Sequence, residues 1–232
     1  MKALVLAAGL GSRLGLDIPK PMFVVSDRPI LEHNILLLKK HGIKDICINV
    51  HYKKEIIKDY FRDGSNFGVN IQYSEEDVLL GTSGAVKKLE KHLQDDDFIV
   101  VYGDNYSEIN LTEMISFHKK YNPVGTIAVF NPMVVPNSGI AGGTIKIDDS
   151  FRVLNFNEVK TVNATDYVNA GVYILNPSIL SNIPRNIMSD FGKDIFAKLI
   201  EDGKILMCYV TNSFVFAIDT KESLKETQKN TN

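Results

Sequence analysis

Two kinds of hydrophobic pattern alternate along the first half of the chain. Short segments rich in apolar residues, ending at glycine or polar positions, predict buried strands at 3–7, 45–50, 70–74 and 98–102. Between them, apolar residues recur at helical spacing, which predicts helices over 30–41, 53–61 and 83–93. This alternation of strand and helix with short connections predicts a parallel sheet covered by helices on both faces.

The second half of the chain is richer in strand patterns. Strands are predicted at 126–130, 143–147, 153–156, 167–175, 206–210 and 214–219. A helix is predicted over 190–201, and Thr220 begins a terminal helix. No linker and no internal repeat divides the chain, so the pattern predicts one mixed domain over residues 1–232.

The composition excludes several classes of protein. The chain has 232 residues, of which 44% are hydrophobic and 23% charged, as in an ordinary folded domain. A net charge of −2 gives no support for a nucleic-acid binder that relies on a positive field. No apolar run approaches the ~20 residues of a membrane span. We therefore expect neither a nucleic-acid nor a membrane partner.

The amino terminus and the cysteines indicate the compartment. The apolar start at Met1 ends at Gly9 and is followed by Arg13, which favours a buried first strand over a signal peptide. Cys47 and Cys208 match no zinc or redox spacing, so they are predicted to be buried apolar residues in a reducing compartment. Both observations predict a cytoplasmic protein.

Polar segments that contain glycine follow predicted strands at Gly9–Arg13, Gly81–Gly84 and Gly103–Asn105. Ligands of parallel α/β sheets bind beyond the carboxyl ends of the strands, so we expect these segments to meet at one site. In the first segment, glycines let the backbone approach a phosphate, and Arg13 and Lys20 add charge suited to a triphosphate. Leu14 stands where a dinucleotide fingerprint needs its third glycine, which argues against an oxidoreductase, and no Walker loop is present.

The first segment, followed by Pro19-Lys20-Pro21, resembles the signature of the sugar-1-phosphate nucleotidylyltransferases, also called nucleotide-sugar pyrophosphorylases. Five further motifs continue the resemblance in the order of that family, over most of the chain. They are Leu80–Ala85, Tyr102–Asn105, Phe156–Glu158, Asn169–Tyr173 and Ser189–Asp194.

The resemblance implies a fold and a reaction. The fold is a Rossmann-like α/β fold with a mixed, mostly parallel central sheet and helices on both faces, divided into a nucleotide-binding half at 1–110 and a sugar-phosphate-binding half at 111–232. In the reaction, an oxygen of a sugar 1-phosphate attacks the α-phosphorus of a nucleoside triphosphate, and pyrophosphate leaves. The chemistry needs alignment and charge neutralisation, with Mg²⁺ as cofactor, and no covalent intermediate.

The resemblance also assigns residues to roles. Arg13, Lys20 and Asp104 are the implied catalytic residues, and Asp104 and Asp219 are the implied metal ligands. The residues implied to bind the nucleotide are Leu6, Ala7, Ala8, Gly9, Gly11, Ser12, Arg13, Gly81, Thr82, Ser83 and Gly103. Those implied to bind the sugar phosphate are Asn105, Glu158, Lys160, Asn169 and Gly171. Glu158 and Asn169 also interrupt apolar strands, where burial without a partner would be costly.

Three departures from the family pattern concern these residues. Arg13 and Lys20 are only seven positions apart, so the loop over the triphosphate is short. Val159 separates Glu158 from Lys160, which turns the lysine to the other face of a regular strand unless a bulge restores it. The carboxylate of Asp219 stands two positions later than the family's aspartate, but positions 217 and 219 share a strand face.

The motifs leave several activities open. Gly81–Gly84 and Asp190–Asp194 are most similar to mannose- and heptose-1-phosphate guanylyltransferases, which favours GTP with such a sugar 1-phosphate and a nucleotide sugar destined for surface polysaccharide such as capsule. The segment ending at Asp219 is similar to the cytidylyltransferase branch, which favours a phosphorylated sugar or small alcohol as substrate. The departures favour a non-catalytic, nucleotide-sugar-binding regulatory relative. A homodimer is a further open alternative.

Overall fold

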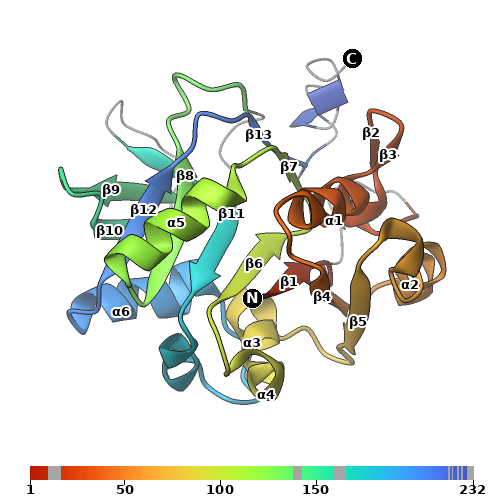
Figure 1. Cartoon of the computed structure of the whole chain (residues 1–232), viewed down its shortest axis with the longest axis horizontal. Helices are drawn as coiled ribbons and strands as arrows, with labels where there is room; N and C mark the ends of the chain where they lie inside the picture. The colour runs from red at the N-terminus through yellow and green to blue at the C-terminus, as the bar shows by residue number, and fades with distance from the viewer. Residues whose placement is uncertain are drawn as a thin grey trace.

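The central feature of the computed structural model is a nine-stranded sheet with the strand order β10-β9-β11-β6-β1-β4-β5, to which β8 adds beside β11 and β12 beside β8 (Figure 1). Strands β10 and β11 run opposite to the other strands of this sheet. The structure describes residues 1–9, 17–137, 143–158, 166–218, 220, 222–223, 225 and 227–228.

The first half of the chain supplies the parallel part of the sheet. Its strands are β1 (Lys2–Leu6), β4 (Asp45–Val50), β5 (Asn70–Glu75) and β6 (Phe98–Tyr102). Strand β1 pairs with both β4 and β6, and β5 pairs with the outer side of β4. The predicted strands are therefore confirmed, and their carboxyl ends lie along one edge.

The second half extends the same sheet. Its strands are β8 (Gly125–Phe130), β9 (Thr144–Ile147), β10 (Val153–Asn157), β11 (Tyr167–Leu175) and β12 (Leu206–Val210). Strand β11 is the junction, because it pairs antiparallel with β6 on one side and with β8 and β9 on the other. The two halves thus share one continuous sheet.

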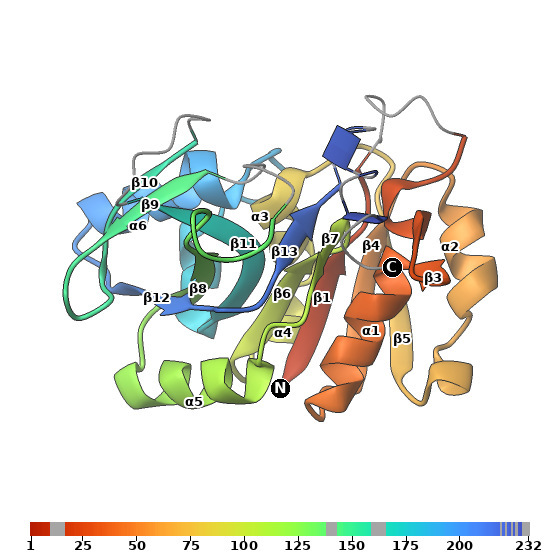
Figure 2. The same cartoon turned by 90° about the horizontal axis from the view of Figure 1, so that it is seen from above.

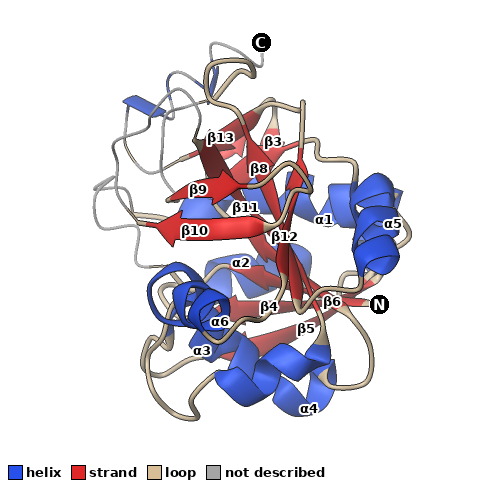
Figure 3. Cartoon of the chain, turned by 90° about the vertical axis from the view of Figure 1, so that its left-hand side faces the viewer, coloured by secondary structure: helices blue, strands red, loops and turns tan. Residues whose placement is uncertain are grey.

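Helices cover both faces of the sheet, as the alternation predicted. Ala3 and Val5 of β1 face one way and pack with α1 (Ile30–Lys40), α2 (Lys54–Phe61) and α5 (Leu111–Tyr121). Leu4 faces the other way and packs with α3 (Gly81–Lys88), α4 (Glu90–Leu93) and α6 (Ala197–Glu201). Figure 3 shows α1 and α5 on one side of the sheet and α3 and α6 on the other. Each fully buried Leu or Ile stabilises this arrangement by about 1.5–3 kcal/mol.

The helices differ from the sequence prediction at three places. The helix expected over 190–201 is a π-helix, η5 (Phe191–Phe196), followed by α6, and Asp194 accepts a hydrogen bond from the Asp190 N–H at its start. The helix expected over 83–93 begins at Gly81 and divides at Leu89 into α3 and α4. Helix α5 is an element that the hydrophobic pattern did not predict, and the Asn110 side chain caps it.

The strand expected at 214–219 is shorter and lies outside the central sheet. Strand β13 (Val215–Ala217) pairs antiparallel with β7 (Asn105–Ser107), which directly follows β6 (Figure 2). A hairpin of β2 (Val24–Val25) and β3 (Arg28–Pro29) packs against this pair through a separate apolar cluster that includes Phe23, Tyr106 and Phe216. This small layer supports the chain around the end of β6.

Two other expectations concern the end of the chain and the cysteines. Thr220 and Ser223 each accept a hydrogen bond from the other's N–H, as at a helix start, which agrees with the predicted terminal helix. Cys47 and Cys208 are free and buried, as predicted. Within the described ranges, no helix has the length and apolar character needed to cross a bilayer.

Candidate active site

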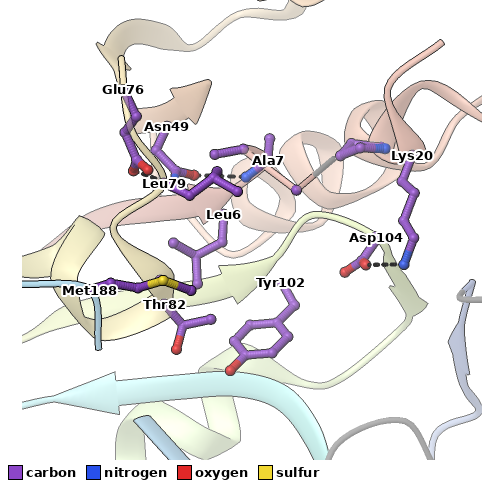
Figure 4. Close-up of a pocket in the computed structure, with 14 residues that line it drawn as sticks. Leu6, Ala7, Lys20, Asn49, Glu76, Leu79, Thr82, Tyr102, Asp104 and Met188 are labelled. Carbon is purple, nitrogen blue, oxygen red and sulfur yellow. Dashed lines mark hydrogen bonds and ion pairs between the residues drawn. The ribbon is translucent and has the colours of Figure 1, made fainter. Parts of the chain in front are cut away.

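A cavity of about 250 Å³ opens at the carboxyl edge of the parallel strands (Figure 4). Its walls come from the end of β1, the turn before β2, the start of α3 and the turn after β6, so described residues of the three glycine-containing segments, Gly9, Gly81, Thr82 and Asp104, lie around one cavity. The predicted site residues that line it are Leu6, Ala7, Ala8, Gly9, Lys20, Gly81, Thr82 and Asp104. Gly103 supports this edge through its N–H, which donates to the Leu6 carbonyl at 2.9 Å.

Lys20 and Asp104 form an ion pair at this cavity. The Lys20 Nζ lies 3.3 Å from the Asp104 Oδ2, with 12% and 29% of the two side chains exposed. Lys20 begins a short 3₁₀ turn, η2 (Lys20–Met22), directly after Pro19, and Asp104 lies in the turn between β6 and β7. Two residues that are 84 positions apart are thus brought together at the predicted place.

A second polar group on the cavity wall was not predicted from the sequence. Asn49 accepts a hydrogen bond from the Ala7 N–H at 2.7 Å and donates one to Glu76 Oε1 at 2.8 Å. The Leu80 N–H donates to Glu76 Oε2 at 3.0 Å, and only 4% of Glu76 is exposed. Each carboxylate oxygen therefore accepts one bond from a neutral donor. The sequence signal that indicates these two residues is their position, since Asn49 lies at the end of the buried strand β4 and Glu76 directly follows β5.

The loop at the start of α3 is fastened to residues more than 100 positions away. Gly81 has a φ of +74°, and a Cβ there would lie 2.4 Å from the Ser189 carbonyl oxygen, so only glycine fits. The N–H groups of Ser83 and Gly84 donate to the same carbonyl, and the Thr82 N–H donates to Asp190 Oδ1. Ser83 is fully buried, bonds to the Ser189 hydroxyl and does not line the cavity.

Three residues predicted to bind the sugar lie together behind the cavity. Asn169 donates to the Tyr173 hydroxyl at 2.7 Å and accepts from the Gly171 N–H at 2.9 Å. Asn105 donates to the Ala170 carbonyl at 3.0 Å, and a Cβ on Gly171 (φ +71°) would lie 2.5 Å from the Asn105 amide. Both asparagine side chains are buried and bonded within the chain, and none of the three residues lines the cavity.

Two tyrosines connect this buried group to the cavity. The Tyr173 hydroxyl donates to the Tyr102 hydroxyl at 3.2 Å, and Tyr102 lines the cavity wall. Burial raises the pKa of Tyr102 to about 12 and that of Tyr173 well above its ordinary value. Both hydroxyls therefore stay protonated at neutral pH. Asn169 thus holds the Tyr173 hydroxyl, and Tyr173 in turn holds the hydroxyl of Tyr102 at the cavity wall.

Glu158 lies on the outer side of this region. Its side chain is 38% exposed and lies 3.7 Å from the Lys193 Nζ, which is also 3.8 Å from Asp190. Partial burial raises the pKa of Glu158, and the Lys193 charge opposes that shift. The expectation that Glu158 interrupts an apolar strand is wrong, because Glu158 directly follows the end of β10 and is exposed.

The remaining predicted residues are Gly11, Ser12, Arg13, Lys160 and Asp219, which lie outside the described residues. Among the residues that the structure does describe, no group of three His, Cys, Asp or Glu side chains could hold a metal. Asp104 nevertheless fits Mg²⁺, which is usually held by one or two carboxylates together with substrate phosphates. The N–H of Ile218, the residue before Asp219, donates to the Asp104 carbonyl at 3.1 Å.

Comparison with known proteins adds a family to this geometry. A model of the family described as "Nucleotidyl transferase" matches residues 2–227. A UTP--glucose-1-phosphate uridylyltransferase from Synechocystis is 34% identical over 220 residues, which are 88% of this chain and 56% of that protein. A D-glycero-alpha-D-manno-heptose 1-phosphate guanylyltransferase from Campylobacter jejuni is 36% identical over 78% of this chain and 79% of its own length. The chain thus spans little more than half of the Synechocystis relative.

Solved structures agree with this relationship. HddC from Yersinia pseudotuberculosis, complexed with GMP-PN, superimposes with a TM-score of 0.83 at 26% identity, over 99% of this chain and 98% of its own. A putative glucose-1-phosphate thymidylyltransferase from Bacillus anthracis gives a TM-score of 0.86 at 20% identity, over 100% of this chain and 95% of its own, and shares the fold. The mixed sheet with helices on both faces is the fold expected from the sequence.

Proposed function

Because this chain belongs to the nucleotidyl transferase family, we propose that it transfers a nucleotidyl group from a nucleoside triphosphate to a sugar 1-phosphate, forming a nucleotide sugar and pyrophosphate. The observation that carries the proposal is the Lys20–Asp104 pair beside a cavity whose wall includes the residues Leu6–Gly9. A cation and a carboxylate at one edge of a cavity suit a reaction that redistributes phosphate charge. The relatives named as uridylyl- and guanylyltransferases of sugar 1-phosphates support it.

The residues of this chain act by position and charge. An oxygen of the sugar phosphate attacks the α-phosphorus, and the bond to pyrophosphate breaks. Lys20 neutralises charge that builds on the α-phosphate, Asp104 keeps the Lys20 ammonium in place, and Arg13 contacts the phosphates. Mg²⁺, when bound by Asp104 and Asp219, supplies further neutralisation of the phosphate oxygens. On the sugar side, Glu158 and Lys160 contact the acceptor, and Asn105, Asn169 and Gly171 support the wall behind it, with Asn169 acting through Tyr173.

Glu76 favours guanine as the base. The Watson–Crick edge of guanine presents two neighbouring N–H donors, and an ionised carboxylate offers acceptors only. Both Glu76 oxygens retain a second acceptor position beside the bonds from Asn49 and Leu80. Uracil presents a single N–H between two carbonyl oxygens, which a carboxylate repels, and cytosine presents only its exocyclic amino group as a donor, so neither offers the two neighbouring donors of guanine. We therefore propose GTP as the preferred nucleotide, and the similarity of the Gly81–Gly84 and Asp190–Asp194 motifs favours a mannose- or heptose-type 1-phosphate as the second substrate.

The proposal also extends to cellular context. Its product would supply surface polysaccharide such as capsule, made in the cytoplasm, and a homodimer is compatible with it. Because the chain spans only 56% of the Synechocystis relative, the proposal concerns nucleotidyl transfer alone and no further activity of such longer proteins.

Pyrophosphate release from a panel of substrates tests the proposed function. We expect Mg²⁺-dependent release with GTP and a mannose- or heptose-type 1-phosphate, and little with CTP, UTP or phosphorylated alcohols. Turnover of CTP with a phosphorylated alcohol would instead support the cytidylyltransferase alternative. Nucleotide binding without turnover across the whole panel would support the regulatory alternative.

A further inference from the structure

A second and larger cavity, of about 650 Å³, lies on the other side of the loop that follows β5. We name it the outer cavity, and its charged lining residues are Glu76, Asp77, Lys87, Lys88, Glu90, Lys91 and Arg185. It is formed by α3, α4 and the segment 185–186, and α3 and α4 lie next to one another in Figure 1. We propose that the outer cavity binds a phosphate-bearing small molecule and that this ligand strengthens nucleotide binding in the active-site cavity.

Positive charge gathers on one wall of the outer cavity. Lys88 and Lys91 are three positions apart at the junction of α3 and α4, and Arg185 reaches the cavity from the other segment. Arg185 is 75% exposed, and Lys88 is bonded to the backbone carbonyl of Glu75. In the described part of the chain, Lys91 has no ion-pair partner. These three cations are suited to a phosphate group.

The acidic groups at the outer cavity do not cancel this charge. Lys87, which is buried, neutralises Glu90 through a contact of 2.7 Å, so Arg185, which lies 2.6 Å from the other Glu90 oxygen, adds an excess positive charge. Glu76 accepts its bonds on the inner side of the loop, as described above. Asp77 is exposed and belongs to the loop after β5, not to the helices that carry the lysines. Burial, together with the charge of Lys2, lowers the pKa of His92, so that this ring adds no charge at neutral pH.

The size and the apolar lining of the outer cavity define the rest of the ligand. A volume of about 650 Å³ exceeds what a bare phosphate fills and is within the usual range for small-molecule sites. Val78, Leu80 and Leu89 contribute apolar surface beside the cations. The shared chemistry is therefore a phosphate attached to a ring, as in a sugar phosphate or a nucleotide.

The two cavities share their walls. Glu76 lines both, Leu80 faces the outer cavity, and Gly81 faces the active-site cavity. On the second segment, Arg185 lines the outer cavity and Met188 lines the active-site cavity. The Ser189 N–H donates to the Leu80 carbonyl at 2.9 Å and joins the two segments. A ligand that bridges them from outside would hold the loop in the position that a nucleotide needs, which couples the two sites reciprocally.

Calorimetric binding tests the outer cavity without any turnover. The protein is saturated with GTP in the absence of sugar 1-phosphate and then titrated with glucose 6-phosphate, AMP or inorganic phosphate. We expect glucose 6-phosphate or AMP to bind more tightly than inorganic phosphate. Lys91→Glu should weaken that binding by roughly tenfold or more, as expected for loss of a charge-assisted contact, while the matched charge reversal Lys198→Glu on α6 should leave it unchanged.

Thermal unfolding of both variants verifies that they fold. The proposed site would be contradicted if the wild type and Lys91→Glu bound the probes equally. It would also be contradicted if no probe bound at about 10 mM, which is about the weakest useful affinity. Arg185→Ala provides a second variant that does not reverse charge, and it should also weaken binding.

The coupling rests on the proposed nucleotide-binding role, and a separate titration tests it. Saturating ligand in the outer cavity should lower the dissociation constant for GTP by roughly fivefold, and this change should disappear in Lys91→Glu. An unchanged GTP affinity with the ligand bound would overturn the coupling. Absence of GTP binding altogether would count against the proposed function, and absence of transfer activity alone would leave both binding results standing.

Discussion

Lys20 and Asp104 show how single residues set the chemistry of this site. Their charged groups lie 3.3 Å apart and are largely shielded from solvent, so each fixes the position of the other where phosphates would bind. Partial burial strengthens the attraction between the two charges relative to the same pair at the surface, where the median ion pair contributes about 0–1 kcal/mol to stability. Each of the two residues can be tested by its own substitution.

We predict that Asp104→Asn lowers kcat sharply, because it removes the charge that holds Lys20 and offers oxygen ligands to Mg²⁺. The expected loss is about 2–4 kcal/mol of transition-state stabilisation, measured by steady-state pyrophosphate release. Asp45→Asn, an exposed aspartate at the opposite end of the sheet, is the matched control and should keep full activity. An unchanged kcat at saturating Mg²⁺ would remove Asp104 from the catalytic site.

Glu76 is the corresponding test of base selection. Glu76→Gln replaces an acceptor by an amide that also donates, so discrimination of GTP over UTP in kcat/KM should fall by roughly 1–3 kcal/mol, the usual worth of a base-edge contact. The neighbouring Glu75→Gln is the control, because Glu75 bonds Lys54 and Lys58 at the surface. If both variants kept the same preference as the wild type, Glu76 would not read the base.

Among the secondary-structure elements, the loop at the start of α3 depends on its attachment to the segment before the π-helix η5. The contacts join the carbonyl of Ser189 to the N–H groups of Ser83 and Gly84, and Asp190 to Thr82. The Phe191 N–H donates in turn to the Thr82 hydroxyl at 2.9 Å. The π-helix therefore begins at a residue that is bonded to this loop, and π-helical turns often occur at functional sites.

Gly81→Ala tests this attachment. The new Cβ would meet the Ser189 carbonyl at 2.4 Å, in addition to the strain of a φ of +74°. We expect a loss of about 1–3 kcal/mol in the free energy of unfolding and weaker nucleotide binding. Gly203→Ala isolates the contact, since Gly203 has a φ of +72° but nothing within 4 Å of the added Cβ. Equal destabilisation by the two substitutions would show that the contact with Ser189 does not matter.

Across the molecule as a unit, buried polar groups tie the covering helices to the sheet. His118 on α5 is 1% exposed, its Nδ1 lies 2.8 Å from the Thr126 hydroxyl of β8, and its Nε2 lies 3.5 Å from Asp97. Burial lowers the pKa of His118, and the nearby Asp97 charge opposes part of that shift. The folded protein therefore binds a proton at His118 less readily than the unfolded chain does.

This difference in proton binding predicts how stability depends on pH. As the pH falls through the ordinary pKa of histidine toward the lowered value, the unfolded chain gains protons first, so the free energy of unfolding decreases. His118→Gln keeps a donor and an acceptor but removes the titration. Chemical denaturation at pH 8, 7, 6 and 5 should therefore show a smaller loss in the variant than in the wild type. If the free energy of unfolding fell equally with pH in both proteins, His118 would not contribute to the pH dependence of stability.

Most of the elements and the position of the cavity follow from local sequence pattern. Hydrophobic periodicity is a local property, so it predicted β1, β4, β5 and β6 and the helices between them within a few residues. Glycine-containing segments after parallel strands necessarily meet at one edge, so Gly81, Lys20 and Asp104 were expected together and line one cavity. The roles of Arg13, Lys160 and Asp219 stay predictions, because these residues lie outside the described ones.

Long-range packing, in contrast, determines which side chains face the cavity and which form hydrogen bonds within the chain. Asn49 and Glu76 look like ordinary polar residues near strand ends, and their position beside Ala7 depends on the pairing of β1 with β4 and of β4 with β5. Asn169 was expected at the sugar, yet both of its polar groups are bonded within the chain. Strand β13 pairs with β7 instead of the central sheet. Each outcome depends on contacts between residues far apart in sequence, which local patterns cannot specify.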